Sequence, residues 1–341
     1  MSKDKLNTAV LGLNEQGRLL LDAASKLDHF HLQAVADKDT NLTEKIAAQY
    51  KCQYYDDYRL LLTENQFDCL IVAAPLHSTE EFIQMAMKKK CNILKSPPLA
   101  RNFEEALHLV RLAKNQNIKL AVANYSRFSQ SFRDLQQALI QNQFEQIFLV
   151  TAFCTFTTKN TGQWQTDPKL AGGGVLLHDC YQMLDSIVQN FDMPQQVYSI
   201  NTNTAGDRQQ RLYSTEDTAI LTMKFNDTLI GNLIATKVFG PEKQYLNIHA
   251  KDNIIYVSKT HFSVADASGK VKTNIEYEDN YSLCAIKLLE NFALSILSPG
   301  KNTLASSADQ NLKNMALIDT AYLSERTAMP EEPRRMLKMV D

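Results

Sequence analysis

Short apolar runs alternate with longer amphipathic stretches through about the first 120 residues. The runs are rich in apolar and β-branched residues, and we predict strands at 8–13, 30–37, 67–75, 91–95 and 118–124. Apolar residues at helical spacing predict helices over 15–27, 41–50, 78–89 and 102–116. Repeated strand–helix units of this length imply right-handed crossovers, so we expect an α/β, doubly wound parallel sheet.

The pattern changes after about residue 145, where strand-like runs follow one another across polar turns. They predict strands over 146–156, 196–204, 217–225, 228–239, 244–250 and 253–258, and helices over 281–297 and 306–328. This half is expected to be an α+β domain with an open, mostly antiparallel sheet. We therefore predict two domains, 1–124 and 125–341, and the C-terminal helix is a candidate to pack back on the first domain.

Composition and charge narrow the class of protein. A net charge of −2 argues against a nucleic-acid or anionic-membrane partner. The first ten residues lack the apolar core of a signal peptide, and no apolar run is long enough to span a bilayer. Six scattered cysteines without metal-ligand spacing indicate reduced, buried thiols and no metal site. We expect a soluble, cytoplasmic protein.

A glycine-containing turn separates the first predicted strand from its helix. In GLNEQG, Gly12, Asn14 and Gly17 occupy the three positions of the G-x-G-x-x-G turn that approaches a dinucleotide pyrophosphate. Asn14 replaces the middle glycine, and asparagine tolerates left-handed backbone angles better than most residues. The strand before and the helix after favour a cofactor site over an ordinary loop, with contacts from Gly12, Leu13, Asn14, Glu15, Gln16 and Gly17.

Two further loops are expected at the same edge of the sheet. Asp37 ends the second strand, where a carboxylate can accept hydrogen bonds from the adenosine ribose hydroxyls. Lys38 beside it can meet a 2′-phosphate, so NAD and NADP both stay open, with the carboxylate favouring NAD. The loop after the third long strand supplies Ala74, Pro75 and His77, and His77 either touches the cofactor or simply caps the next helix.

Several segments together resemble the glucose–fructose oxidoreductase / inositol dehydrogenase (Gfo/Idh/MocA) family over nearly the full length. They are AVADKD, VAAPLHS, NILKSPPLA, ANYSRFSQSF, WQTDPKLAGGGVLLHDCYQMLD and ALIDTAYLSERT. The resemblance implies a Rossmann domain followed by a domain whose open sheet holds the substrate site and often an oligomer interface. It also implies hydride transfer between NAD(P) and a carbonyl or alcohol carbon, usually on a sugar, a polyol or a relative.

The family's catalytic lysine is missing from its usual position. The family has Glu-Lys-Pro there, with the lysine holding the substrate oxygen near the nicotinamide, and the aligned residues here are Ser96, Pro97 and Pro98. In an extended segment Lys95 and position 97 point the same way, about 7 Å apart. Lys95 therefore either delivers its ammonium to the cleft or is a solvated lysine at a strand end. Pro97 is expected beside the cofactor, and the Pro97–Pro98 bond is a candidate cis peptide.

The helix after the triple glycine departs from the family as well. Where the family has an aspartate, a histidine that serves as acid/base, and a second aspartate, this chain has His178, Gln182 and Asp185. Steps of four and three residues place these on one helix face. Gln182 cannot exchange a proton at neutral pH, so His178 or Tyr181 is the candidate proton donor or acceptor. The alternative is that His178 only makes a hydrogen bond within the domain interface.

Other residues match family positions that line or border the substrate cleft. Arg127 either pairs with a substrate carboxylate or phosphate, or anchors the interdomain helix. The full set of expected substrate contacts is Asn124, Arg127, Trp164, Gln182 and Asp185.

The leading hypothesis is an NAD(P)-dependent oxidoreductase with an altered acid/base set, acting on a sugar-, polyol- or cyclitol-like substrate. The alternative is a catalytically inactive nucleotide- or ligand-binding regulatory protein on the same fold. A third possibility is that Asn14 blocks the pyrophosphate and no nucleotide binds. A homo-oligomer, dimer or tetramer, is expected in either of the first two cases, because an open sheet face is usually covered.

Overall fold

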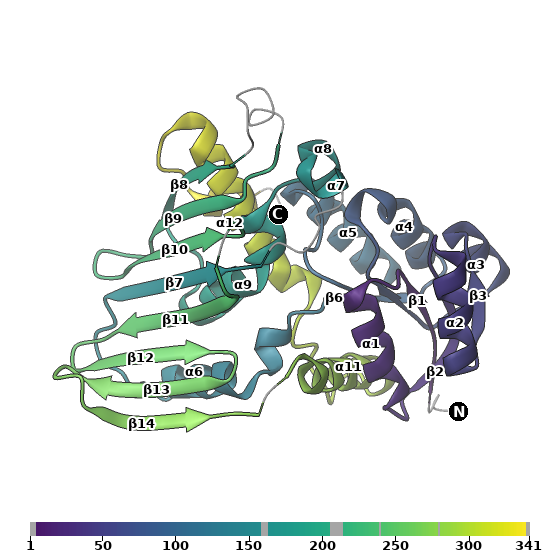
Figure 1. The fold of residues 1–341 in the computed structure, drawn as a ribbon, viewed down its shortest axis with the longest axis horizontal. Coiled ribbons are helices and arrows are strands. Elements are labelled where there is room, and N and C mark those ends of the chain that lie inside the picture. Colours follow the sequence, from purple (N-terminus) through teal and green to yellow (C-terminus); the bar gives the residue numbers. More distant parts are fainter. Residues whose placement is uncertain (1–4, 158–162, 205–213, 239, 279, 339–341) are drawn as a thin grey trace. The chain divides into compact units, whose positions relative to one another are not determined.

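The computed structural model describes residues 5–157, 163–204, 214–238, 240–278 and 280–338. The chain divides into two compact units, which are described separately below (Figure 1). The first comprises residues 1–99, 104–125 and 281–311, and the second comprises 100–103, 126–280 and 312–341.

The first unit is built on a six-stranded parallel sheet, as the alternating pattern predicts. The strand order is β3-β2-β1-β4-β5-β6. The order in which the chain adds strands reverses beside β1, as is typical of a Rossmann fold. The apolar runs give strands buried on both faces, and Val10, Leu11 and Ile71 have no exposed surface. The strands are β1 (Leu6–Leu11), β2 (Phe30–Ala36), β3 (Gln53–Tyr55), β4 (Cys69–Val72), β5 (Asn92–Lys95) and β6 (Leu120–Val122).

Helices connect these strands, and aspartates begin two of them. Asp39 caps α2 through the amide of Leu42, and Asp57 caps α3 through the amide of Arg59. A helix from late in the chain, α11, packs beside α1 in this unit. The helices are α1 (Glu15–Ser25), α2 (Thr40–Tyr50), α3 (Tyr58–Glu64), η1 (Leu76–Ser78), α4 (Glu80–Lys88), α5 (Phe103–Gln116) and α11 (Tyr281–Leu297), while η2 (Tyr125–Phe128) belongs to the second unit from residue 126 on.

The second unit contains an eight-stranded sheet in the order β14-β13-β12-β11-β7-β10-β9-β8. Neighbouring strands are antiparallel except for the parallel pair β7 and β10, so the mostly antiparallel sheet is confirmed. The strands are β7 (Leu149–Thr155), β8 (Gln196–Thr202), β9 (Thr218–Lys224), β10 (Ile230–Thr236), β11 (Lys243–His249), β12 (Asn253–Ser258), β13 (His261–Asp266) and β14 (Val271–Glu276).

One face of this sheet packs on helices. Figure 1 shows α6, α9 and α12 on that side. Buried and exposed residues alternate along β9 and β10, and Leu221 and Leu233 are among the buried ones. The helices of this unit are α6 (Gln130–Ile140), α7 (Gln163–Thr166), α8 (Pro168–Ala171), η3 (Val175–Asp179), α9 (Tyr181–Phe191), α12 (Ala308–Thr327) and α13 (Pro333–Leu337).

Two further observations bear on the class of protein. None of the six cysteines forms a disulfide, and all but the partly exposed Cys52 are buried, as expected for reduced thiols. Among the described helices, none is both long and apolar enough to cross a membrane.

Candidate functional site

The first turn approaches the loop after β4 so closely that only glycine fits. Gly12 has φ +93°, and a β-carbon there would collide with the backbone of Ala74. Gly17 faces the carbonyl oxygen of Gly12 and has no room for a side chain either. The geometry of the turn therefore requires glycine at both positions, and the chain has glycine at both.

Asn14 supports this turn in a different way from the one the sequence suggests. Its backbone is extended, with φ −63°, so left-handed tolerance is not what the position needs. Instead Asn14 is the N-cap of α1. Its Oδ1 accepts a hydrogen bond from the Gly17 amide at 2.9 Å, and its Nδ2 donates to the Ala73 carbonyl at 2.5 Å. The substituted residue therefore ties the turn to the β4 loop.

The carboxylate of Asp37 binds the same turn from the other side. Its Oδ2 accepts a hydrogen bond from the Leu13 amide at 2.6 Å, and its Oδ1 accepts one from the Asp39 amide at 3.1 Å. Loops after three adjacent strands, β2, β1 and β4, are thereby joined at their carboxyl ends. This is the edge at which doubly wound sheets bind ligands.

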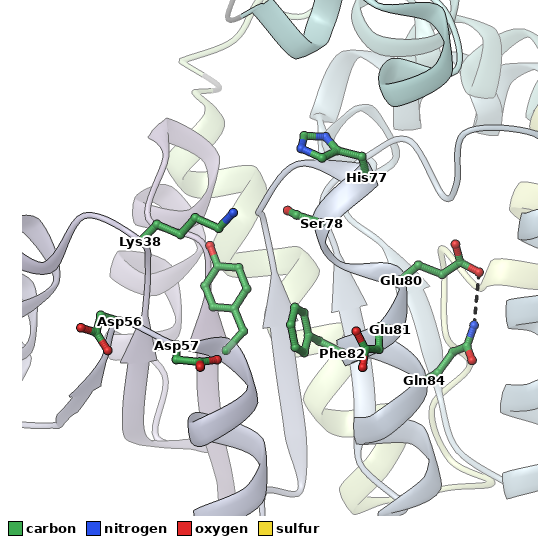
Figure 2. Close-up of a pocket in the computed structure, with 10 residues that line it drawn as sticks. Lys38, Asp56, Asp57, His77, Ser78, Glu80, Glu81, Phe82 and Gln84 are labelled. Carbon is green, nitrogen blue, oxygen red and sulfur yellow. Dashed lines mark hydrogen bonds between the residues drawn. The ribbon is translucent and has the colours of Figure 1, made fainter.

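An open pocket of about 730 Å³ continues from this edge. Figure 2 shows Lys38, Asp56 and Asp57 on one side and residues of η1 and α4 on the other. The rings of Tyr58 and Phe82 meet edge to face at 5.5 Å within the lining. Four of the ten lining residues are carboxylates, so the pocket is acidic despite Lys38: Asp56, Asp57, Glu80 and Glu81.

The remaining predicted cofactor residues lie around these loops. Leu13 and Ala74 are buried, whereas Glu15, Lys38 and His77 are exposed. His77 lines the acidic pocket together with Ser78.

One side-chain acceptor at the turn has no partner within the described ranges. The side-chain oxygen Oε1 of Gln16 is buried without a hydrogen-bond partner in the described part of the chain. A buried acceptor left unpaired costs about 1–3 kcal/mol, and a ligand donor would remove this cost. Together with the glycine geometry, this shows that the residues present fit a dinucleotide.

Lys95 ends β5 and is buried, with 2% of its surface exposed. The solvated-lysine alternative is therefore wrong. The ammonium nitrogen Nζ donates a hydrogen bond to the Pro98 carbonyl at 2.7 Å, beneath a loop in which the predicted Pro97–Pro98 cis peptide is present. Burial lowers the pKa of Lys95 to about 7, against the opposing charge of Glu105.

Asn124, at the end of β6, is also fully buried. Its Nδ2 donates a hydrogen bond to Asn311 Oδ1 at 2.9 Å, while its own Oδ1 is a second buried acceptor without a partner among the described residues.

In the second unit, Arg127 and Asp185 form a buried bidentate ion pair. Arg127 Nε donates to Asp185 Oδ2 at 2.8 Å and its Nη2 to Oδ1 at 2.6 Å, with side-chain exposures of 6% and 0%. Asn314 donates to the same carboxylate at 2.7 Å. Two residues predicted to contact substrate are thus paired with each other. Through this edge of its guanidinium, Arg127 anchors α9, which agrees with the alternative that it has a structural role.

His178 lies on a π-helical turn, η3, ahead of α9. The prediction that His178, Gln182 and Asp185 share one helix face is therefore wrong, because the step from 178 to 182 crosses the junction at Cys180. The ring atom Nε2 lies 3.0 Å from the Ala171 carbonyl, which can only accept, so Nε2 bears the hydrogen. Trp164 meets the imidazole edge to face at 5.7 Å, so two predicted site residues are in contact.

The other predicted residues of α9 are more enclosed. Tyr181 has no exposed surface, and Gln182 accepts a hydrogen bond from the Ser126 amide at 3.3 Å. Gln182 is half-buried.

Glu216 is a buried residue next to His178's turn that the sequence does not single out. This buried carboxylate accepts hydrogen bonds from the amides of Gly174 and Leu176, at the start of the turn that contains His178. Its only signal in the sequence is an acidic pair before an apolar strand. In the described part of the chain, no group of three or more His, Cys, Asp or Glu side chains could hold a metal ion.

Two family models cover most of the chain. An oxidoreductase family with an NAD-binding Rossmann fold matches residues 6–124, and the C-terminal alpha/beta domain of the same family matches residues 136–331. The chain belongs to the Gfo/Idh/MocA family. Its first unit is accordingly an NAD-binding Rossmann domain within a family of oxidoreductases.

Relatives with known names are distant. An uncharacterized oxidoreductase, YrbE, of Bacillus subtilis is 19% identical over 278 residues, which cover 76% of this chain and 78% of that protein. A 2,7-anhydro-N-acetylneuraminate hydratase of Escherichia coli is 20% identical over 264 residues, covering 74% and 67%. One of these similar proteins is therefore named for a hydration rather than for an oxidation.

Solved structures share the fold over nearly the whole chain. An oxidoreductase from Agrobacterium radiobacter, in complex with NAD+, L-tartaric acid and magnesium, has a TM-score of 0.84 at 16% identity, covering 97% of this chain and 99% of that one. The WlbA dehydrogenase from Bordetella pertussis, in complex with NADH and UDP-GlcNAcA, has a TM-score of 0.81 at 16% identity, covering 96% and 98%.

The buried amine of Lys95 predicts a pH-dependent stability difference. Above about pH 7 the amine is neutral in the folded protein, whereas it stays protonated in the unfolded chain up to about pH 10. In this window the unfolded state binds one proton more than the folded state, so raising the pH disfavours the unfolded state and the folded state gains stability. Relative to Lys95→Met, the wild-type free energy of unfolding should rise by about 1.4 kcal/mol per pH unit.

Urea unfolding at several pH values between 7 and 10 measures this difference, and other titrating groups cancel between the two proteins. The matched control is Lys88→Met on the exposed surface of α4, which should give no slope. A flat difference for Lys95→Met would show that the amine is charged in the folded protein.

Proposed function

We propose that this chain is an NAD-dependent, cytoplasmic oxidoreductase that transfers a hydride to or from a sugar-, polyol- or cyclitol-like substrate. Its acid/base set is altered, with Lys95 and either His178 or Tyr181 in place of the family's lysine and histidine. The observation on which the proposal rests is the turn at Gly12 and Gly17, joined by Asn14 and Asp37 to the neighbouring loops.

The acidic surroundings of the turn support NAD over NADP. Asp37 lies at the turn, and Asp56 and Asp57 line the pocket next to Lys38. A 2′-phosphate placed there would meet several carboxylates and one lysine, and like charges in proximity are destabilising. The reduced cysteines support a cytoplasmic location.

Bound NAD supplies the hydride acceptor, and the protein must move the proton on the substrate oxygen. Lys95, with a pKa of about 7, can exist in both protonation states at neutral pH. In neutral His178, the hydrogen on Nε2 leaves Nδ1 as the basic nitrogen. Tyr181 is the alternative donor on the first turn of α9.

The names of family members support the substrate class. A relative from Saccharopolyspora spinosa is a dTDP-3,4-didehydro-2,6-dideoxy-alpha-D-glucose 3-reductase, and another structure of the same fold is a levoglucosan dehydrogenase in complex with NADH. Both act on sugars or sugar derivatives according to their names.

Two observations favour the alternative, a catalytically inactive binding protein. The Lys95 amine already donates to the Pro98 carbonyl, and Gln182 is bonded to the Ser126 amide in the histidine's place. Such a protein would keep the nucleotide site without the proton transfer.

Turnover with NAD and NADP on panels of polyols, sugar acids and nucleotide sugars tests the proposal. Substrate loss should be followed by NMR as well as by nicotinamide absorbance, so that a reaction without net oxidation is detected. Removing an acid/base typically lowers the rate by about 10²–10⁴-fold, which is the effect expected for Lys95→Met, and for His178→Gln or Tyr181→Phe.

Lys88→Met serves as the unaffected control. Tight nucleotide binding without turnover on any panel would support the inactive alternative. Turnover that all three variants leave intact would contradict the assigned residues.

We also propose that a second copy of the chain covers the free face of the eight-stranded sheet. The strand register aligns one apolar row across five strands: Ile200, Ile220, Ile234, Phe153 and Tyr245. The three isoleucines are 56%, 44% and 36% exposed. Contiguous apolar surface of this kind marks an interaction site.

Sedimentation velocity should therefore show a dimer or tetramer, and Ile220→Glu should shift it to monomer because a charge would be buried in the row. The control is Ile140→Glu on α6, a residue that is 72% exposed outside this row. A monomeric wild-type protein would contradict the proposal.

A further inference from the structure

Glu216 precedes β9 and holds the segment that leads to His178. Its Oε2 accepts a hydrogen bond from the Gly174 amide at 2.8 Å, and its Oε1 accepts one from the Leu176 amide at 3.0 Å. Its main-chain carbonyl accepts the Val175 amide at 3.0 Å. One residue thus binds three consecutive amides at the start of the π-helical turn.

Thr215, the residue before Glu216, holds α7, the helix on the other side of His178. Thr215 Oγ1 donates to the Gln165 carbonyl at 2.8 Å, and the Thr215 amide donates to the Thr166 carbonyl at 3.1 Å. These carbonyls belong to α7, which contains Trp164. The Thr215–Glu216 dipeptide therefore fixes both partners of the Trp164–His178 contact.

The glycines before His178 are explained by the same network. A β-carbon at Gly174 would collide with the carbonyl oxygen of Glu216, and one at Gly173 would collide with the phenol of Tyr322. The Tyr322 hydroxyl in turn donates to Glu216 Oε1 at 2.8 Å. The glycine pair permits this close approach of backbone and side chains.

The network requires a carboxylate. Three donors, the Gly174 and Leu176 amides and the Tyr322 hydroxyl, converge on two oxygen atoms. A glutamine side chain has a single acceptor oxygen, so its NH₂ group would face a backbone N–H in either orientation. A buried donor without an acceptor costs about 1–3 kcal/mol, enough to displace the turn.

We propose that Glu216 is a positioning residue that holds His178 against Trp164. This inference rests on the proposed function, in which His178 moves the substrate proton. Glu216 itself acts only through the backbone of residues 174–176.

Trp164 is the sole tryptophan of the chain and reports on the contact directly. A protonated imidazole quenches the fluorescence of an adjacent indole, so wild-type emission should fall as the pH decreases through about 8 to 5, where histidines titrate. His178→Gln should abolish this transition. Glu216→Gln should remove most of its amplitude or shift its midpoint while far-UV circular dichroism stays unchanged.

Tyr322→Phe is the matched control, because it removes one donor and leaves both amide bonds, and it should titrate like the wild type. Should Glu216→Gln fail to fold, Glu216→Asp keeps the charge but cannot reach both amides, and the same loss is expected. A folded Glu216 variant with the wild-type transition would overturn the proposal.

Activity separates this inference from the proposed function. If His178 moves the proton, Glu216→Gln should also lower kcat by about 10- to 100-fold with little change in KM, as for a misplaced catalytic group. A changed fluorescence titration with unchanged turnover would contradict the role of His178 while leaving the positioning by Glu216 intact.

Discussion

The close approach of the first turn to the loop after β4 is the constraint on which the nucleotide-binding unit depends. At Gly12 a side chain would strike the backbone of Ala74, and at Gly17 it would strike the carbonyl of Gly12. Hydrogen bonds then hold the turn: Asn14 donates to the Ala73 carbonyl, and Asp37 accepts from the Leu13 amide. The turn is thus held in place by the protein's own atoms.

The charged and titratable side chains of the candidate site fall into two groups: those that hold the backbone in place, and those that are candidates for proton exchange. In the second unit the buried carboxylates of Asp185 and Glu216 are saturated by donors and serve the packing of α9 and the glycine segment. By resemblance, Pro97 and Gln182 stand where the family has its lysine and its acid/base histidine. Two titratable residues close to them along the chain, Lys95 and His178, each have one atom bonded to a carbonyl.

Much of the fold could be predicted from the sequence, because long apolar runs are buried on both faces or alternate along one. β12 and α11 match their predicted ranges, and β1 begins two residues before its predicted start. The pattern missed β13, in which only Phe262 and Val264 are buried, and two edge strands: β3, which is short and mostly exposed, and β14, whose side chains are mainly polar or exposed. Strands at sheet edges lack the apolar signal that burial imposes.

The candidate site was less predictable, since its geometry depends on tertiary contacts. The glycine turn and the cis Pro97–Pro98 bond follow from local chemistry, whereas the burial of Lys95 requires the loop that folds over it. A π-helical turn has no signature in residue spacing, so the face shared by residues 178–185 could not be read correctly. Glu216 reaches residue 174 from the segment before β9, 42 positions away along the chain.

Calorimetric titration of NADH tests the central claim, that a dinucleotide binds against the turn at Gly12. The account predicts saturable binding to the wild type, weaker binding of NADPH, and loss of both in Gly12→Ala. Gly269→Ala is the matched control, because that glycine also has a positive φ but has no atom within 4 Å of an added β-carbon. A wild-type protein that gives no heat at millimolar NADH, or Gly12→Ala binding that equals the wild type, would contradict the account.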